Sequence, residues 1–182
     1  SVHDMSASYL DMKNSFLVIL TLVGIQQINA QFTRRDSLQG GLRIERTSYD
    51  VKRYDLNITI NPEQKSIKGF NEISFEVMVK TKKIQLDLFD NMKVDSIVWN
   101  TKKLKYNRDN DAVFIDFPEK LASKSNHKLK FYYSGNPKIA KNAPWDGGFV
   151  FKKDSNGKDF IGVAVQGTGA SLWYPVKDSQ TD

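Results

Sequence analysis

Residues 162–175, near the end of the sequence, hold the side chains best suited to contact a ligand. Gln166 carries hydrogen-bond donors and an acceptor, and it stands where an alternating strand opens into Gly167-Thr168-Gly169. The two glycines permit unusual backbone angles or the close approach of another chain or ligand. The same letters also fit a structural bulge, and nothing in them identifies a reaction.

Residues that act through a thiol, an imidazole or a metal are scarce. The sequence has no cysteine and only two histidines, His3 and His127. Disulfides, thiol nucleophiles and cysteine-zinc sites are therefore excluded. A histidine-based catalytic triad could use only one of these two histidines. His127 stands at the start of a predicted strand and is expected to be a lone surface histidine. We expect no catalytic residue and no metal site in this chain.

One acidic stretch resembles the opening of a calcium loop. Asp154, Asn156 and Asp159 alternate around Gly157, as oxygen ligands do in that geometry. Residues 160–166 supply no distal glutamate, however. A hairpin turn explains the same letters and is the favoured interpretation.

The basic residues could in principle form a nucleic-acid surface. Lys80, Lys82-Lys83 and Lys102-Lys103 lie on predicted strands, and the chain has a formal net charge of +6. Aromatic residues do not interleave with these lysines, and lysine on an edge strand discourages sheet aggregation. A solvated edge is therefore favoured, with no nucleic-acid partner.

The elements that must position these residues are strands. From Tyr49 onward apolar and polar residues alternate with period two, as in Tyr54, Leu56, Ile58 and Ile60. Asn-Gly in 154–158 predicts a hairpin turn. Residues 119–123 are expected to form a short helical turn. Strands are predicted at residues 54–60, 72–80, 84–88, 94–99, 104–106, 113–117, 129–133, 149–152 and 160–165. The fold class is therefore all-β, an antiparallel sandwich or barrel-like sheet.

The first thirty residues are expected to be a targeting segment. Residues 12–30 have the anatomy of a signal peptide, with Lys13 before the ten-residue, mainly apolar run Phe16–Ile25. In a helix that run spans roughly 15 Å, about half of a bilayer's hydrocarbon core, so no stable membrane insertion is expected after cleavage. The protein is expected to be exported, to a periplasmic or extracellular location.

Four segments follow from this division of the chain. Residues 1–11 are expected to be an upstream extension and residues 12–30 the signal peptide. Residues 31–46 are polar and are expected to form a loose lead-in. Residues 47–182 form the β domain, which is expected to be incomplete at its C-terminus because no closing strand follows the Trp-Tyr-Pro segment.

Several motifs resemble the aminopeptidase N family of zinc metallopeptidases, especially its exported bacterial members. Tyr54-Asp55-Leu56 and Ile67-Lys68-Gly69 are similar to that family's first strands. The resemblance is more specific in 143–148, Ala-Pro-Trp-Asp-Gly-Gly, and in 166–178, from Gln-Gly-Thr-Gly-Ala to Val-Lys-Asp. It covers residues 47–182.

The resemblance implies a saddle-shaped N-terminal β domain that packs on a thermolysin-like catalytic domain and extends one loop into the active site. It places Gln166 at a position, usually Glu or Gln, that lines the first substrate pocket and helps to hold the substrate's N-terminal end. The substrate-binding residues would be Gln166, Gly167, Thr168, Gly169 and Ala170. Where many members carry arginine slightly further on, this chain has Ser171 or Leu172.

The resemblance also implies that the chemistry lies elsewhere. The family binds zinc through His-Glu-x-x-His and a downstream glutamate, and the sequence contains no His-Glu pair. The chain is therefore expected to be the inactive front portion of an exported zinc aminopeptidase, truncated before its catalytic domain. Zinc, the catalytic domain and peptides with a free N-terminus are the implied cofactor and partners. The alternative is a stand-alone secreted β-sandwich that binds carbohydrate or protein through Trp145, Trp173 and Tyr174.

Overall fold

The computed structural model describes residues 33–178, and apart from Thr33 these belong to one compact unit that begins at Arg34. The expected upstream extension, 1–11, and the expected signal peptide, 12–30, lie outside the described residues. Among the helices within the described part, none is long and apolar enough to cross a membrane.

Strands dominate the described residues, which confirms the all-β prediction. The helical segments are α2 (Arg34–Gly40), α3 (Ile44–Thr47) and η1 (Ala170–Leu172). The strands are β1 (Tyr49–Asn61), β2 (Ser66–Val77), β3 (Thr81–Asp87), β4 (Met92–Trp99), β5 (Lys102–Lys103), β6 (Lys105–Asp109), β7 (Ala112–Leu121), β8 (Asn126–Gly135), β9 (Gly148–Lys153) and β10 (Asp159–Ala164).

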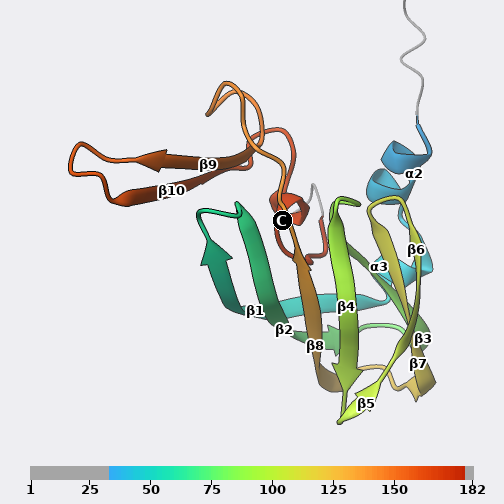
Figure 1. Cartoon of the computed structure of the whole chain (residues 1–182). Helices are drawn as coiled ribbons and strands as arrows, with labels where there is room; N and C mark the ends of the chain where they lie inside the picture. Colours follow the sequence, from blue (N-terminus) through green and yellow to red (C-terminus); the bar gives the residue numbers. More distant parts are fainter. Residues whose placement is uncertain (1–32, 179–182) are drawn as a thin grey trace, which may run out of the picture. The chain divides into compact units, whose positions relative to one another are not determined.

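Two antiparallel sheets enclose the core, as the sandwich prediction requires. One sheet has the strand order β1-β2-β8-β4-β5 and the other β3-β7-β6, while β9 and β10 form a separate hairpin (Figure 1). Alternate side chains from both sheets meet between them, because successive residues of a strand point to opposite faces. The core includes Ile73, Phe75, Ile97, Leu129 and Phe131 from the larger sheet, and Ile84, Leu86, Val113, Ile115 and Phe117 from the smaller one.

A β-bulge decides which residues of β1 face the core. The register between β1 and β2 shifts between Val51 and Arg53. An extra residue reverses the alternation, so Val51 before the bulge and Tyr54 and Ile58 after it all pack against the core. The bulge thereby turns the phenol of Tyr54 toward the C-terminal segment that carries the candidate site.

The lead-in is more ordered than the sequence analysis expects. Instead of a loose segment, residues 34–40 and 44–47 form α2 and α3, with Leu38 and Arg46 buried. Tertiary contacts hold them: the Leu38 carbonyl accepts a hydrogen bond from Gln85, and Arg46 pairs with Asp87. Helices of seven and four residues are too short to show a helical period in the sequence.

The expected helical turn at 119–123 is wrong. Strand β7 continues to Leu121, which is buried and pairs with Thr81 of β3. Burial of Leu121 in the core therefore overrides the local preference of the polar residues around it.

The hairpin interpretation of 154–158 is confirmed. One carboxylate oxygen of Asp154 accepts the backbone N–H groups of Asn156 and Lys158, each at 2.8 Å. Gly157 has a φ of 77°, the left-handed conformation that such a turn needs. The oxygen that a calcium loop would offer to a cation is therefore used to close the turn.

His127 is more buried than the surface position expected for it. Its ring lies 5.7 Å from the rings of both Trp99 and Phe75, and Ser125 is within hydrogen-bond distance. Burial lowers the pKa of the His127 imidazole. These contacts indicate a structural role.

Candidate functional site

The segment Val165–Ala170, here called the Gln166 loop, leaves β10 through a tight turn. The backbone N–H groups of Thr168 and Gly169 donate to the Val165 carbonyl at 3.1 and 3.0 Å. Gly167 and Gly169 have φ angles of 72° and 77°, which other residues adopt only with strain. The two glycines thus give the loop its shape.

The five residues predicted to bind substrate lie together in this loop, but they are not equally accessible. Gln166 and Gly167 are exposed, whereas Thr168, Gly169 and Ala170 are half-buried. The Gln166 amide makes no hydrogen bond to any residue between 33 and 178. Its donors and its acceptor therefore remain available for a ligand.

A second loop, far away in sequence, supports the first. A side-chain carbon added at Gly147 would lie 2.1 Å from the Thr168 hydroxyl oxygen, so the two loops are in close contact. The loop that carries Gly147 is closed by Asp146, whose carboxylate accepts the N–H groups of Lys141 and Asn142 at 2.6 and 2.7 Å. The two most specific motifs of the sequence are thus brought together.

Helix η1 fixes the far end of the Gln166 loop. The Ser171 carbonyl accepts the N–H of Phe89 at 2.9 Å, and the Ser171 hydroxyl donates to the Asp178 carboxylate. A side-chain carbon at Gly169 would lie 2.7 Å from that same carboxylate. Both Ser171 and Leu172 are buried.

The aromatic residues around the loop are mostly part of the packing. The Trp173 ring meets Phe149 edge-on at 5.8 Å, and Tyr174 meets Tyr54 at 6.0 Å. Only Trp145 of the three aromatic residues considered for a binding module is fully exposed, with 80% of its surface accessible. Trp173 and Tyr174 are half-buried, so they lack the exposure that the alternative binding module would need at these positions.

Asp87 joins the segment that follows the loop to the sandwich. Its backbone exchanges two hydrogen bonds with Val176, at 2.8 and 3.0 Å, and its carboxylate accepts the N–H of Asp178 at 3.3 Å. The same carboxylate pairs with Arg46 at 2.5 Å and accepts a hydrogen bond from Gln85 at 2.9 Å. Burial raises the pKa of Asp87 to about 6, against the opposite influence of Arg46.

Further bonds hold the same segment. The Asn71 amide donates to the Pro175 carbonyl at 2.8 Å. The backbone N–H of Lys177 donates to the Tyr54 phenol at 2.9 Å, and its ammonium group donates to the Tyr49 carbonyl at 2.8 Å. The exposed loop therefore stands on a buried and well-bonded base.

The Gln166 loop offers groups that can form hydrogen bonds with a ligand. Gln166 supplies a neutral carbonyl acceptor and an amide donor, and residues 165–170 contain no titratable side chain. Within residues 33–178, no group of three or more histidines, cysteines, aspartates or glutamates could hold a metal ion. A carbonyl acceptor suits an ammonium group, with less attraction than a carboxylate would provide.

Sequence reasoning missed the residues that hold the loop from a distance. Two strands lie between Gly147 and the loop in the sequence, and seven lie between Asp87 and the loop. The buried Arg46 partner of Asp87 lies in the segment expected to be loose. Of these contacts, only that of Gly147 with Thr168 could have been suspected from the sequence, because Gly147 belongs to the 143–148 motif.

Comparisons with known proteins agree on one family. A model described as the peptidase M1 N-terminal domain matches residues 50–179. The M1 zinc metallopeptidase from Deinococcus radiodurans shares 20% identity with a TM-score of 0.58, over 74% of this chain and 30% of that one. Native leukotriene A4 hydrolase from Saccharomyces cerevisiae shares 16% identity with a TM-score of 0.57, over 73% of this chain and 22% of that one. The match thus spans less than a third of either protein, and no curated protein matches.

Proposed function

The chain belongs to the peptidase M1 N-terminal domain family, and from that premise we propose that it is the front domain of an exported zinc aminopeptidase. Its part would be to present Gln166 to the first substrate pocket, which a catalytic domain would complete. The substrates would be peptides with a free N-terminus. This domain would help to hold the substrate's ammonium group, and the bond cleavage would take place on the catalytic domain.

One observation carries this proposal: Gln166 is exposed and unbonded within the described residues, while the backbone on both sides of it is fixed. The loop rests on Gly147 on one side and on Asp178 on the other. Because the backbone is already fixed and the side chain forms no hydrogen bond within its own domain, Gln166 could bind a ligand with little loss of backbone conformational entropy.

The described residues do not fit a zinc site, since no metal-holding group exists between 33 and 178. The metal of the proposed enzyme would therefore be bound by residues outside this part of the chain. What this chain's residues would do is bind and orient: the Gln166 carbonyl would accept a hydrogen bond from the substrate's terminal ammonium group.

The test uses the full-length enzyme carrying Gln166→Ala. We expect KM for a peptide with a free N-terminus to rise about tenfold to hundredfold, because a hydrogen bond to a charged group is lost. Gln166→Glu should instead lower KM, because a carboxylate attracts the ammonium group more strongly. Zinc content and Tm should stay unchanged in both variants.

Gln64→Ala is the matched control, since Gln64 is also exposed but lies in the turn between β1 and β2. It should leave KM unchanged. Affinity for an N-acetylated peptide, measured as competitive inhibition, should not respond to Gln166→Ala. Unchanged KM in Gln166→Ala, or an equal loss with the acetylated peptide, would remove the assigned role.

Export is tested separately on the expressed protein. If residues 12–30 form a signal peptide, the mature protein in the exported fraction should begin at Gln31. N-terminal sequencing of that fraction checks this, and a mature protein that retains residues 12–30 would contradict it.

A further inference from the structure

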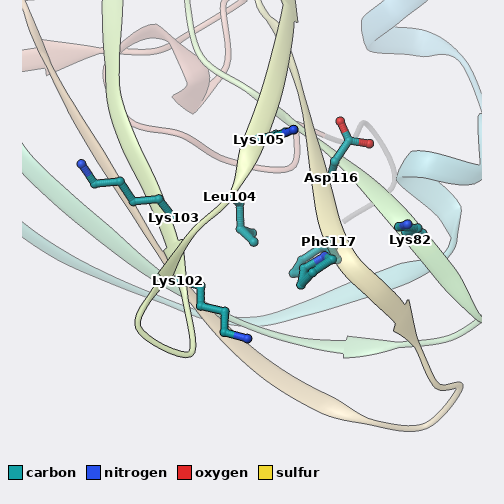
Figure 2. A pocket seen from close by; sticks show the side chains of 8 residues that line it. Lys82, Lys102, Lys103, Leu104, Lys105, Asp116 and Phe117 are labelled. Atoms are coloured by element: carbon teal, nitrogen blue, oxygen red, sulfur yellow. The ribbon is translucent and has the colours of Figure 1, made fainter.

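A second site lies where the chain crosses from one sheet to the other. Strand β5 pairs with β4 alone and is the last strand of the larger sheet. Leu104 then donates its N–H to Ile97 of β4 at 2.8 Å, and Lys105 begins β6 opposite Asp116 of β7. A cavity of about 450 Å³ lies at this crossing. We call it the β5–β7 corner; it is lined by Lys82, Lys102, Lys103, Leu104, Lys105, Asp116, Phe117 and Pro118 (Figure 2).

Strand β7 is incompletely paired beside the cavity. Asp116 is the last residue of β7 that pairs with β6, and on its other side it pairs with Lys83 of β3. The next β3 pairing is Thr81 with Leu121, so the register shifts there. Residues 117–120 therefore have no ladder partner in β3 or β6 within the described sheets. Extended backbone of this kind is where a peptide strand can add.

The charge around the cavity is strongly positive. Asp116 is the only acidic residue of the lining, and it already pairs with Lys83 at 3.3 Å. Four lysines line the cavity, all exposed, and none forms an ion pair within residues 33–178: Lys82, Lys102, Lys103 and Lys105. Figure 2 shows lysine side chains from three strands around Leu104 and Phe117.

The lining also has an apolar part. Leu104 and Phe117 form the inner wall and are buried, while Pro118 is exposed beside them. A single-stranded nucleic acid would stack its bases on exposed aromatic rings, and the one aromatic residue of the lining, Phe117, is only 1% accessible. A polyanionic sugar would use the charges but neither the apolar wall nor the unpaired strand.

We propose that the β5–β7 corner binds an extended acidic peptide segment of a partner protein. The peptide's backbone would pair with Glu119 and Lys120, the exposed residues of this stretch that have a backbone N–H, because Phe117 is buried and Pro118 has no N–H. Its side chains would alternate, as in any strand, so that apolar ones contact Leu104 and Pro118 and acidic ones reach the lysines. This surface shares no residue with the Gln166 loop, so the proposal does not depend on the proposed function.

The experiment measures binding of a fluorescent peptide to the chain. The probe alternates glutamate and valine and is about six residues long, the length of an ordinary strand. The variant replaces Lys82, Lys102, Lys103 and Lys105 by glutamine. We expect its Kd to rise at least about tenfold, and binding of the unmodified chain to weaken with added salt, because the attraction is between exposed charges.

The matched control replaces four other exposed lysines by glutamine: Lys138, Lys141, Lys152 and Lys158. It removes the same net charge and should bind the probe like the unmodified chain. Circular dichroism should give the same Tm for both variants. If both variants bound the peptide equally weakly, net charge alone would explain the loss of affinity, and the proposal would be overturned.

Two further probes test the form of the ligand. The same peptide N-methylated at alternate residues cannot complete a ladder, so its affinity should fall about tenfold. Sulfated dextran should bind more weakly than the peptide and should not displace it. Equal affinity of the methylated peptide, or lysine-dependent binding of the dextran without binding of the peptide, would overturn the proposal.

Discussion

At the scale of single residues, Asp87 connects more of the molecule than any residue of the Gln166 loop itself. Its carboxylate pairs with Arg46 of α3 and accepts the N–H of Asp178, and its backbone is bonded to Val176. Asp87 thereby joins three parts of the chain: α3, strand β3 of the smaller sheet and the C-terminal segment. Loss of its carboxylate should therefore weaken the contacts between all three.

We expect Asp87→Ala to lower the free energy of unfolding by about 3 kcal/mol at neutral pH, because the Arg46 guanidinium, the Gln85 amide and the Asp178 N–H each lose the oxygen that accepts their hydrogen bond. Urea unfolding checks this. Asp50→Ala is the control: Asp50 and its partner Lys52 are each about half exposed, so the loss should stay below about 1 kcal/mol. Equal losses in the two variants would contradict the role given to Asp87.

The pH dependence of stability should carry the signature of the same group. Burial raises the folded-state pKa of Asp87 to about 6, whereas in the unfolded chain it is about 3.9. Between these values the folded state binds more protons, so stability should fall as pH rises from about 4 to about 6, by at most about 3 kcal/mol.

The comparison of Asp87→Asn with the unmodified chain isolates this contribution. Asparagine does not titrate, so the unfolding free energy of the unmodified chain minus that of Asp87→Asn should fall over the same pH range. A difference that stays constant, or rises, from pH 4 to 6 would show that the ionised carboxylate is the favoured form in the folded state.

What could be predicted at this scale follows from how local each signal is. Gln166 and its glycines could be singled out as candidates because the strand, the glycines and the Trp-Tyr-Pro segment follow one another in the sequence. Asp87 and Arg46 could not be paired, because 41 positions separate them and neither sits in a distinctive pattern. Ion pairs of this kind depend on the tertiary arrangement that only the folded chain provides.

At the scale of elements, the Gln166 loop depends on the loop that precedes β9. A side-chain carbon at Gly147 would lie 2.1 and 2.5 Å from the hydroxyl and methyl groups of Thr168. Gly147→Ala should therefore displace one loop from the other and destabilise the protein by about 1–3 kcal/mol, as overpacking does. Thr168→Ala removes both of these groups but keeps the Thr168 Cβ, which would lie 2.8 Å from the added carbon, so the double variant should recover only part of that loss.

A double-mutant cycle in urea measures this coupling, which we expect to exceed about 1 kcal/mol. Gly40→Ala is the control, since a side-chain carbon there would meet nothing within 4 Å. It should change stability by less than about 1 kcal/mol. Additive effects of Gly147→Ala and Thr168→Ala would show that the two loops are not packed as described.

Strands and hairpins could be predicted where the alternation of apolar and polar residues and the residues of the turn pointed to the same structure. The hairpin of β9 and β10 follows from alternation on both sides of an Asn-Gly turn, and the structure has it. Helices α2 and α3 were missed, and so was the extension of β7 to Leu121. In each of these cases burial against distant residues decides the conformation, and short polar segments give no period from which to read it.

At the scale of the whole molecule, the Gln166 loop and the β5–β7 corner share no residue, although β3 contributes to both. The base of the loop is bonded to Asp87 at the end of β3, whereas the corner is built by β5, β6 and β7 together with Lys82 at the start of β3. Their separation means that substitutions in one should leave the other unaffected. The sequence showed the sandwich that carries both, since strand alternation fixes the two faces. It could not show the corner, which exists only because the chain changes sheets at Leu104.

The last prediction concerns what the chain can do alone. Within residues 33–178 there is no group that could hold a metal and no titratable side chain in the Gln166 loop. The 182-residue chain, incubated with zinc and an aminoacyl amide, should therefore release no product above the rate of the buffer. It should also retain less than one zinc ion per chain after dialysis, because exposed carboxylates and single histidines bind zinc weakly.

Adding the chelator 1,10-phenanthroline separates the possible results. Product formation that the chelator abolishes would show that a metal centre forms within the chain, and it would contradict the division of labour proposed here. Stoichiometric zinc without hydrolysis would contradict the lack of a metal site while leaving the inactivity intact. Inactivity of the chain, together with loss of substrate affinity when Gln166 is replaced in the full-length enzyme, is the combination that the proposed function predicts, with substrate recognition on this domain and bond cleavage on a catalytic domain.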